Sequence, residues 1–261
     1  MNSMLEISSV SIAFGGIKAV RDVSLSVPAG TVFSIIGPNG AGKTTLFNII
    51  SGVYVPQDGS IRLNGKDVTG MRSDALAREG LSRTFQNLQV FMQMSAIENV
   101  MVGRHIHERS RTFSQLFSLP GALRENRASQ ERSRELLQFV GLASYAGRSA
   151  AAMPYGALKK LELARALATE PKMILLDEPA AGCNPAETVE VEKLVRKIAS
   201  SGVTVLLVEH DMKLVMRVSD RIHVLDGGQT ICEGTASEVQ RNERVIAAYL
   251  GDHGRSEAAN A

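Results

Sequence analysis

A glycine-rich loop at residues 37–45 constrains the fold of this chain more than any other stretch of its sequence. The loop matches the pattern G-x-x-x-x-G-K-[ST], follows the apolar run Thr31–Ile36 and leads into the amphipathic run Thr45–Ser51. Its residues are Gly37, Pro38, Asn39, Gly40, Ala41, Gly42, Lys43, Thr44 and Thr45. Strand, loop and helix in this order are typical of a phosphate-binding loop, so the pattern predicts an α/β fold that binds a nucleotide.

The residue types in this loop suit phosphate chemistry. Glycines let successive backbone N–H groups turn toward one point, where the start of the following helix adds partial positive charge. Lys43 can then reach the β- and γ-phosphates, and Thr44 can offer its hydroxyl to Mg²⁺. The alternative is a glycine-rich turn that only closes a sheet, and the lysine and threonine at the helix start argue against it.

Composition limits the classes of partner. The 261 residues, 44% of them hydrophobic, suffice for one large domain or for a core with a subdomain. The net charge of +2, from 29 Lys and Arg against 27 Asp and Glu, provides no basic field for nucleic acid, so we expect no nucleic-acid partner. Cys183 and Cys232 lie far apart without metal-ligand spacing, which favours reduced thiols.

No segment predicts export or a membrane span. Met1–Val10 contains Glu6 and lacks a basic region followed by a long apolar one. No apolar run approaches the roughly eighteen residues that a membrane helix needs. We therefore expect any membrane role to come through a partner.

The first third of the chain reads mainly as strands. Leu5–Ala13 and Val23–Val27 alternate as strands do, Gly59–Val68 resembles a hairpin, and Arg72–Glu79 has a helical pattern. Phe14 follows the first strand and precedes two glycines. Its ring is either a core aromatic or a flat face against which a nucleotide base can stack.

The chain changes character after the strand predicted at Leu81–Phe85. From Gln89 to Ala152 the pattern is helical and more polar, with helices predicted at Ser95–Val102 and Ala128–Val140 and an irregular, arginine-containing connector at Arg104–Asn126. Glutamates are interleaved with the arginines of this region. We therefore expect a solvated or protein-docking surface rather than one that binds nucleic acid.

Two carboxylates follow the next buried strand. A helix at Met153–Ala168, with Pro154 in its first turn, precedes the strand Met173–Leu176, which runs into Asp177 and Glu178. A carboxylate at the end of a buried strand is costly unless it has a function. Asp177 can hold Mg²⁺ through its water shell, and Glu178 can orient or deprotonate a water molecule aimed at the γ-phosphate. The alternative, a charged turn, is disfavoured because Lys43 is in the same chain.

The last third adds another strand end with a polar residue. A helix at Glu187–Ser200 and a buried strand at Val203–Val208 precede His210. In a doubly wound sheet ligands bind outside the carboxyl ends of the strands, so we expect His210 to lie beside Asp177 and to contact the γ-phosphate, unless it is a plain surface residue.

The remaining C-terminal sequence is simpler. Arg221–Leu225 and Gln229–Cys232 predict a closing hairpin, Arg244–Leu250 a short helix, and Gly251–Ala261 a disordered tail.

Together these motifs give the chain a family resemblance. Over nearly its full length it resembles the nucleotide-binding subunit of an ATP-binding cassette (ABC) transporter, and runs such as Arg83–Asn87 and Ala247–Gly251 look like the branch that imports branched-chain or hydrophobic amino acids. The motifs that match in the family's order are Phe14, the loop 37–45, Gln86, the signature-helix region Pro154–Ala166, Asp177-Glu178-Pro179, Ala181–Pro185 and His210.

The resemblance implies an architecture. It implies an α/β, P-loop NTPase (RecA-like) core at about 1–88 and 153–250, with an antiparallel β subdomain, an inserted α-helical subdomain at about 89–152 and a disordered tail at 251–261.

The resemblance also implies an activity and partners. Two cassettes would face each other head to tail, each binding ATP and Mg²⁺ between its phosphate loop and the other's signature helix. They would act at the cytoplasmic face of the inner membrane with permease subunits and, indirectly, a solute-binding protein. The implied roles are catalysis by Glu178, His210, Lys43 and Gln86, metal binding by Thr44, Gln86 and Asp177, and nucleotide binding by Phe14, Tyr155, Gly156 and the phosphate loop.

One departure from the family pattern leaves two functions open. The Ser-Gly-Gly-Gln-like core of the signature is Pro154-Tyr155-Gly156-Ala157 here, and Asn184 stands where many cassettes have aspartate. Glu178 and His210 favour an ATP-hydrolysing motor of an importer. Pro154 with Ala157 favours a nucleotide-gated, weakly hydrolysing partner of another cassette. Cassette proteins of ribosomes or DNA, kinases and GTPases fit poorly, because their distinguishing features are missing from the sequence.

Overall fold

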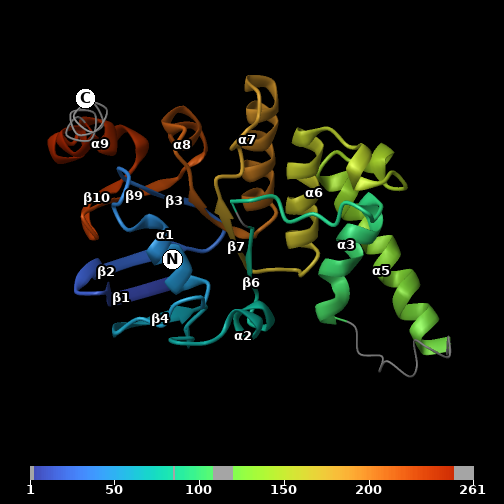
Figure 1. Cartoon of the computed structure of the whole chain (residues 1–261), viewed down its shortest axis with the longest axis horizontal. Helices are drawn as coiled ribbons and strands as arrows, with labels where there is room; N and C mark the ends of the chain where they lie inside the picture. Colours follow the sequence, from blue (N-terminus) through green and yellow to red (C-terminus); the bar gives the residue numbers. More distant parts are fainter. Residues whose placement is uncertain (1–2, 85, 108–119, 250–261) are drawn as a thin grey trace.

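Two β-sheets organise the protein. The computed structural model describes residues 3–84, 86–107 and 120–249 (Figure 1). The smaller sheet is antiparallel, in the order β2-β1-β4-β5. Its strands are β1 (Ser3–Phe14), β2 (Ile17–Pro28), β4 (Asp58–Leu63) and β5 (Lys66–Asp67).

The larger sheet positions the functional residues. Its order is β10-β9-β3-β8-β7-β6, and every neighbouring pair is parallel except β9 with β10. The strands β3, β7 and β8 are buried along their whole length, which explains their continuous apolar sequences. Its six strands are β3 (Val32–Ile36), β6 (Leu81–Arg83), β7 (Met173–Asp177), β8 (Thr204–Val208), β9 (Arg221–Asp226) and β10 (Gln229–Gly234).

Helices cover the larger sheet and extend beyond one end of it. In Figure 1, α3, α5 and α6 lie together at the end farthest from β10, and α7 stands between them and the sheet. The helices are α1 (Lys43–Ile50), α2 (Ser73–Arg78), α3 (Ala96–Arg104), α5 (Pro120–Phe139), α6 (Tyr155–Leu167), α7 (Pro185–Ser200), α8 (Met212–Val218) and α9 (Ala236–Arg241). Residues 243–249 form a further helix.

Two large apolar clusters hold these layers together. One joins the helical end to the sheet and includes Leu137, Leu161 and Leu207. The other includes Phe33 and Phe47 and fills the space between the two sheets and α1. The helix that follows the phosphate loop is thus fixed from both sides, which limits the freedom of the loop itself.

Several boundaries differ from those predicted. The connector expected at Arg104–Asn126 is wrong in part, because Arg104 ends α3 and residues 120–126 belong to α5. This helix begins at Pro120, which suits a first helical position because the backbone N–H that proline lacks is not needed there. Pro154 is the N-cap of α6, with extended ψ of 155°, rather than a residue of its first turn. The sequence pattern also missed the short helices α8 and α9.

The other predicted elements are present. The strand pairs, the hairpin of β9 and β10 and the helix at 243–249 are confirmed. Phe85, Leu250, residues 108–119 of the connector and the tail 251–261 lie outside the described residues. Within the described ranges, no helix combines the length and apolarity that crossing a bilayer requires.

Candidate functional site

The phosphate loop connects β3 to α1 in the geometry that the sequence predicts. Gly42 is the N-cap of α1 with φ of 98°, and a Cβ there would lie 2.5 Å from the carbonyl oxygen of Ala19. A Cβ at Gly37 would lie 2.1 Å from the carbonyl oxygen of Leu225. Both positions therefore require glycine, because no side chain fits against these backbone oxygens.

Lys43 is folded back over its own loop. Its Nζ donates to the carbonyl oxygens of Gly37 at 2.6 Å and Pro38 at 2.9 Å, and the residue is only 6% exposed. A cleft of about 310 Å³ opens in front of it. The residues lining this cleft are Ala19, Asn39, Gly40, Ala41, Gly42, Lys43, Thr44, Thr45, Gln86, Glu178, Val208 and His210.

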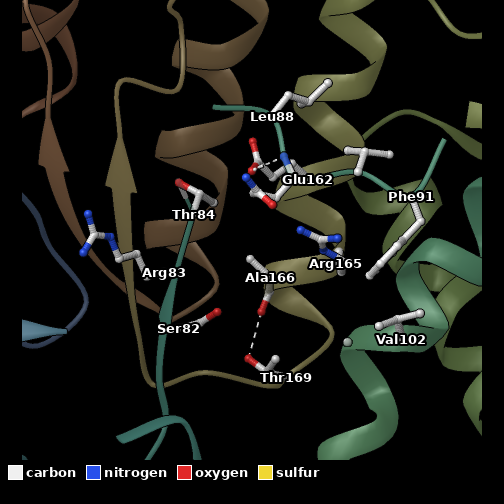
Figure 2. Close-up of a pocket in the computed structure, with 13 residues that line it drawn as sticks. Ser82, Arg83, Thr84, Leu88, Phe91, Val102, Glu162, Arg165, Ala166 and Thr169 are labelled. Atoms are coloured by element: carbon white, nitrogen blue, oxygen red, sulfur yellow. Dashed lines mark hydrogen bonds between the residues drawn. The ribbon is translucent and has the colours of Figure 1, made fainter. Parts of the chain in front are cut away.

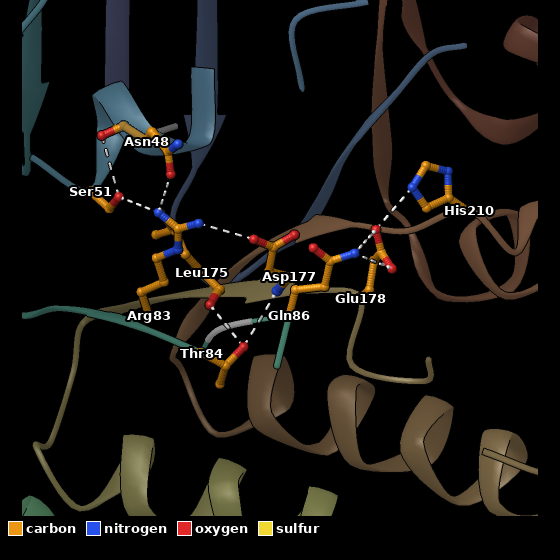
Figure 3. Close-up of polar contacts among 9 residues, drawn as sticks. All are labelled: Asn48, Ser51, Arg83, Thr84, Gln86, Leu175, Asp177, Glu178 and His210. Carbon is orange, nitrogen blue, oxygen red and sulfur yellow. Dashed lines mark hydrogen bonds and ion pairs between the residues drawn. The ribbon is translucent and has the colours of Figure 1, made fainter. Parts of the chain in front are cut away.

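Three residues from separate segments meet in this cleft (Figure 3). Nε2 of Gln86 lies 3.3 Å from each carboxylate oxygen of Glu178, and Nε2 of His210 lies 2.9 Å from Oε1 of Glu178. Glu178 adopts φ of 48°, a left-handed conformation that is strained for a residue with a side chain and that is common at functional sites. The cleft thus places a carboxylate, an amide and an imidazole opposite the phosphate loop.

Asp177 does not line this cleft and is paired with an arginine. Its Oδ2 accepts a hydrogen bond from Nη2 of Arg83 at 3.0 Å, and the two side chains are 9% and 11% exposed. Asp177 is the last residue of β7, whereas Glu178 leaves the strand with φ of 48°, and it is Glu178 that meets His210. Asp177 and His210 both lie at the carboxyl ends of the neighbouring strands β7 and β8, as expected, but the side chain that His210 contacts is that of Glu178.

Glu209 is a buried carboxylate whose role the sequence pattern did not reveal. It accepts hydrogen bonds from the backbone N–H groups of Ala180 at 2.9 Å, His210 at 3.1 Å and Asp211 at 3.5 Å. Burial raises its pKa above the ordinary value, although these hydrogen bonds oppose the shift. Glu209 thereby ties the loop after Glu178 to His210. A charged residue directly after a buried strand was the available signal.

Phe14 is exposed rather than part of the core. Its ring is 45% exposed and packs edge to face against Tyr54, with ring centroids 5.2 Å apart. Phe14 does not line the cleft. The exposed ring is consistent with the second interpretation, a surface on which a base stacks.

The signature segment lies away from the cleft of its own chain. The Tyr155 hydroxyl donates to the carbonyl oxygen of Ala181 at 3.1 Å, and neither Tyr155 nor Gly156 lines the cleft. A Cβ at Gly156 would lie 2.4 Å from Oε1 of Glu187, so α6 begins in close contact with α7. Ala157 is 7% exposed and belongs to the apolar core.

A second hollow separates the sheet from the helical end. This groove has a volume of about 540 Å³. Figure 2 shows Ser82 and Thr84 on one wall and Phe91 and Val102 on the other, with Arg165 between them. The guanidinium of Arg165 lies 5.4 Å from the centroid of the Phe91 ring, and burial lowers its pKa.

Comparison with known proteins identifies the family. The family model described as "ABC transporter" matches residues 20–181, which is more than half of the chain. The chain belongs to the ABC transporter family. It is an ATP-binding cassette with a P-loop NTPase fold, and as an ABC cassette it is an ATPase. A second family model, "Branched-chain amino acid ATP-binding cassette transporter", matches residues 229–255.

Relatives of this cassette are similar over nearly their full length. The high-affinity branched-chain amino acid transport ATP-binding protein BraF of Pseudomonas aeruginosa is 45% identical, over 95% of this chain and 98% of its own. LivG of Escherichia coli, which has the same description, is 40% identical over the same shares. These relatives support an ATP-hydrolysing cassette and give no support to the weakly hydrolysing alternative.

Solved structures agree with this assignment. The crystal structure of the ADP conformation of MJ1267, an ATP-binding cassette of an ABC transporter, matches with a TM-score of 0.84 and 33% identity, over 96% of this chain and all of that one. The dimeric post-hydrolysis structure of the cassette MJ0796 with ADP and phosphate matches with a TM-score of 0.73 and 25% identity, over 89% and 99% of the two chains.

Proposed function

We propose that this cassette powers the import of branched-chain or other hydrophobic amino acids. The observation that carries the proposal is the meeting of Gln86, Glu178 and His210 opposite the phosphate loop, in a chain that is 45% identical to a branched-chain amino acid transport protein. ATP binding would close two cassettes against each other, and hydrolysis would reopen them.

The phosphate loop would hold the nucleotide. Backbone N–H groups of the loop and the start of α1 bind the phosphates, and Lys43 exchanges its two carbonyl partners for the β- and γ-phosphates. The exposed Phe14 ring would stack on the base.

The donor set fits a magnesium ion that travels with the nucleotide. The described residues contain no group of three or more His, Cys, Asp or Glu side chains able to hold a metal alone. Mg²⁺ in nucleotide sites takes only one or two protein ligands besides phosphates and waters. Thr44, Asp177 and Gln86 would provide these contacts, and the ion would neutralise charge on the phosphates.

Glu178 would act as the general base. Its carboxylate lies at the cleft edge, where it can accept a proton from a water molecule that attacks the γ-phosphate. Gln86 would orient this carboxylate through its amide, and His210 would move from Oε1 of Glu178 to a γ-phosphate oxygen. The site would be completed by Tyr155 and Gly156 of a second cassette.

The groove beside β6 would receive a cytoplasmic loop of a membrane permease. Phe91, Met92, Met94 and Val102 expose apolar surface at or near this groove, and such patches commonly mark protein interfaces. The helical part at about 89–152 would then act as a docking subdomain beside the nucleotide core. The cassette would sit at the cytoplasmic face of the inner membrane, with a solute-binding protein on the other side.

Purification of the assembly tests this proposal. The chain should be extracted from its native membrane in mild detergent and its partners identified by mass spectrometry. We expect a hydrophobic permease and a second cassette, protection of the groove from hydrogen exchange, and ATPase activity that rises when branched-chain amino acids and their binding protein are added to the reconstituted complex. Stimulation only by unrelated solutes would contradict the proposed substrate class.

A further inference from the structure

Arg83 connects three parts of the molecule that the nucleotide site depends on. It is the last residue of β6, which pairs in parallel with β7, and Arg83 itself lies opposite Leu175. Its guanidinium reaches Asp177 through Nη2 at 3.0 Å. Through Nη1 it donates to Oδ1 of Asn48 and Oγ of Ser51, both at 2.7 Å, at the end of α1.

The geometry of this contact leaves one oxygen of Asp177 for another partner. Arg83 binds Oδ2, and no hydrogen bond to Oδ1 occurs among the described residues. Figure 3 draws this second oxygen on the side of Asp177 away from Arg83. The backbone N–H of Asp177 is fixed as well, because it donates to Oγ1 of Thr84 at 3.4 Å. The backbone and the side chain of Asp177 are thus held by two consecutive residues, Arg83 at the end of β6 and Thr84 after it.

We propose that Arg83 is a positioning residue that holds Oδ2 of Asp177 against α1, so that Oδ1 faces the magnesium ion of the bound nucleotide. This inference rests on the proposed metal role of Asp177. Only arginine has the required shape. Nη2 of its planar guanidinium donates to Asp177 while Nη1 donates to Asn48, whereas a single lysine ammonium cannot reach both. Partners that hold a metal-ligating carboxylate in this way typically contribute strongly to metal affinity.

Nucleotide binding can be followed without hydrolysis. The purified full chain is titrated with a fluorescent ATP analogue that has a non-hydrolysable β–γ bridge, over a series of Mg²⁺ concentrations. For Arg83→Met we expect the Mg²⁺ concentration for half-maximal tightening to rise about tenfold. The affinity without Mg²⁺ should stay within about twofold of wild type, because the phosphate loop is untouched.

Further variants guard against a general loss of structure. Arg83→Lys keeps the charge and should restore the Mg²⁺ requirement only partly. Arg196→Met removes an exposed arginine that pairs with Asp220 and should behave as wild type. Asp177→Asn should shift the Mg²⁺ requirement as Arg83→Met does, and the double variant should show no further shift, because both changes act on one carboxylate.

The outcomes distinguish a failure of the Arg83 role from a failure of the Asp177 role. If Asp177→Asn shifts the Mg²⁺ requirement but folded Arg83→Met or Arg83→Lys does not, Arg83 is only a structural residue. A lower Mg²⁺ requirement in Arg83→Met would mean that Arg83 competes with the metal, and it would overturn the inference. If Asp177→Asn has no effect, the metal role of Asp177 fails, and the positioning role of Arg83 fails with it.

Discussion

Replacing Gly103 with alanine should separate two helices that the groove depends on. Gly103 lies in α3, where α3 crosses α6, and a Cβ there would lie 2.2 Å from the carbonyl oxygen of Arg165 and 2.9 Å from Cβ of Ala168. Ordinary contacts begin at 3.4 Å. The helices must therefore move apart by about 1 Å, since a backbone oxygen in a packed helix cannot turn away.

The size of the effect follows from two opposing contributions. Overpacking typically costs about 1–3 kcal/mol, whereas alanine gains about 0.8–1 kcal/mol over glycine in helix propensity. Because the clash is with backbone, we expect overpacking to dominate and to destabilise the protein by about 1–2 kcal/mol. For a chain of this size that corresponds to a decrease in Tm of roughly 2–8 °C.

Gly147→Ala is the matched control, because nothing lies within 4 Å of a Cβ at that position. Differential scanning calorimetry of both variants provides the comparison, and the control should stay within about 0.5 kcal/mol of wild type. Since Gly103 also lines the groove, recovery of the permease with Gly103→Ala should decrease. Equal Tm values for the two variants would refute the reasoning that a Cβ at Gly103 clashes with the backbone of α6.

Three further predictions concern the nucleotide site. Lys43→Ala should abolish measurable ATP binding in titration calorimetry, because the cation that neutralises the phosphates is lost; unchanged affinity would contradict the role of the loop. Glu178→Gln should retain ATP binding and slow hydrolysis in the reconstituted complex by about 10²–10⁴-fold, since an amide cannot accept the proton; a wild-type rate would show that another group is the base. Burial raises the pKa of Glu209 in the folded protein. The protonated carboxyl therefore stabilises the fold fully below the ordinary pKa of 4.5, and this stabilisation is lost as pH rises through the raised pKa of the folded state. Urea unfolding should therefore show Glu209→Gln gaining stability relative to wild type as pH rises from about 4.5, and a difference that is constant with pH would contradict this.

Local sequence patterns determined the framework of the site. A buried strand followed by a glycine-rich loop and Lys43 is a local pattern, and the two hydrogen bonds of the Lys43 ammonium stay within residues 37–45. That Asp177 and His210 lie at one edge was predicted from the rule that the carboxyl ends of parallel strands share an edge of the sheet. These predictions needed only the order of strands and polar residues along the chain.

Tertiary structure alone decided which side chains meet. Asp177 and Glu178 are neighbours in sequence, yet one pairs with Arg83 and the other with His210, because the chain leaves β7 at Glu178 in a left-handed conformation. Arg83 reaches Asn48, 35 residues away, only because β6 lies beside β7 and α1 packs between the two sheets. Likewise, the requirement for glycine at position 103 comes from the crossing of α3 with α6, and a helix pattern carries no signal for contacts of that kind.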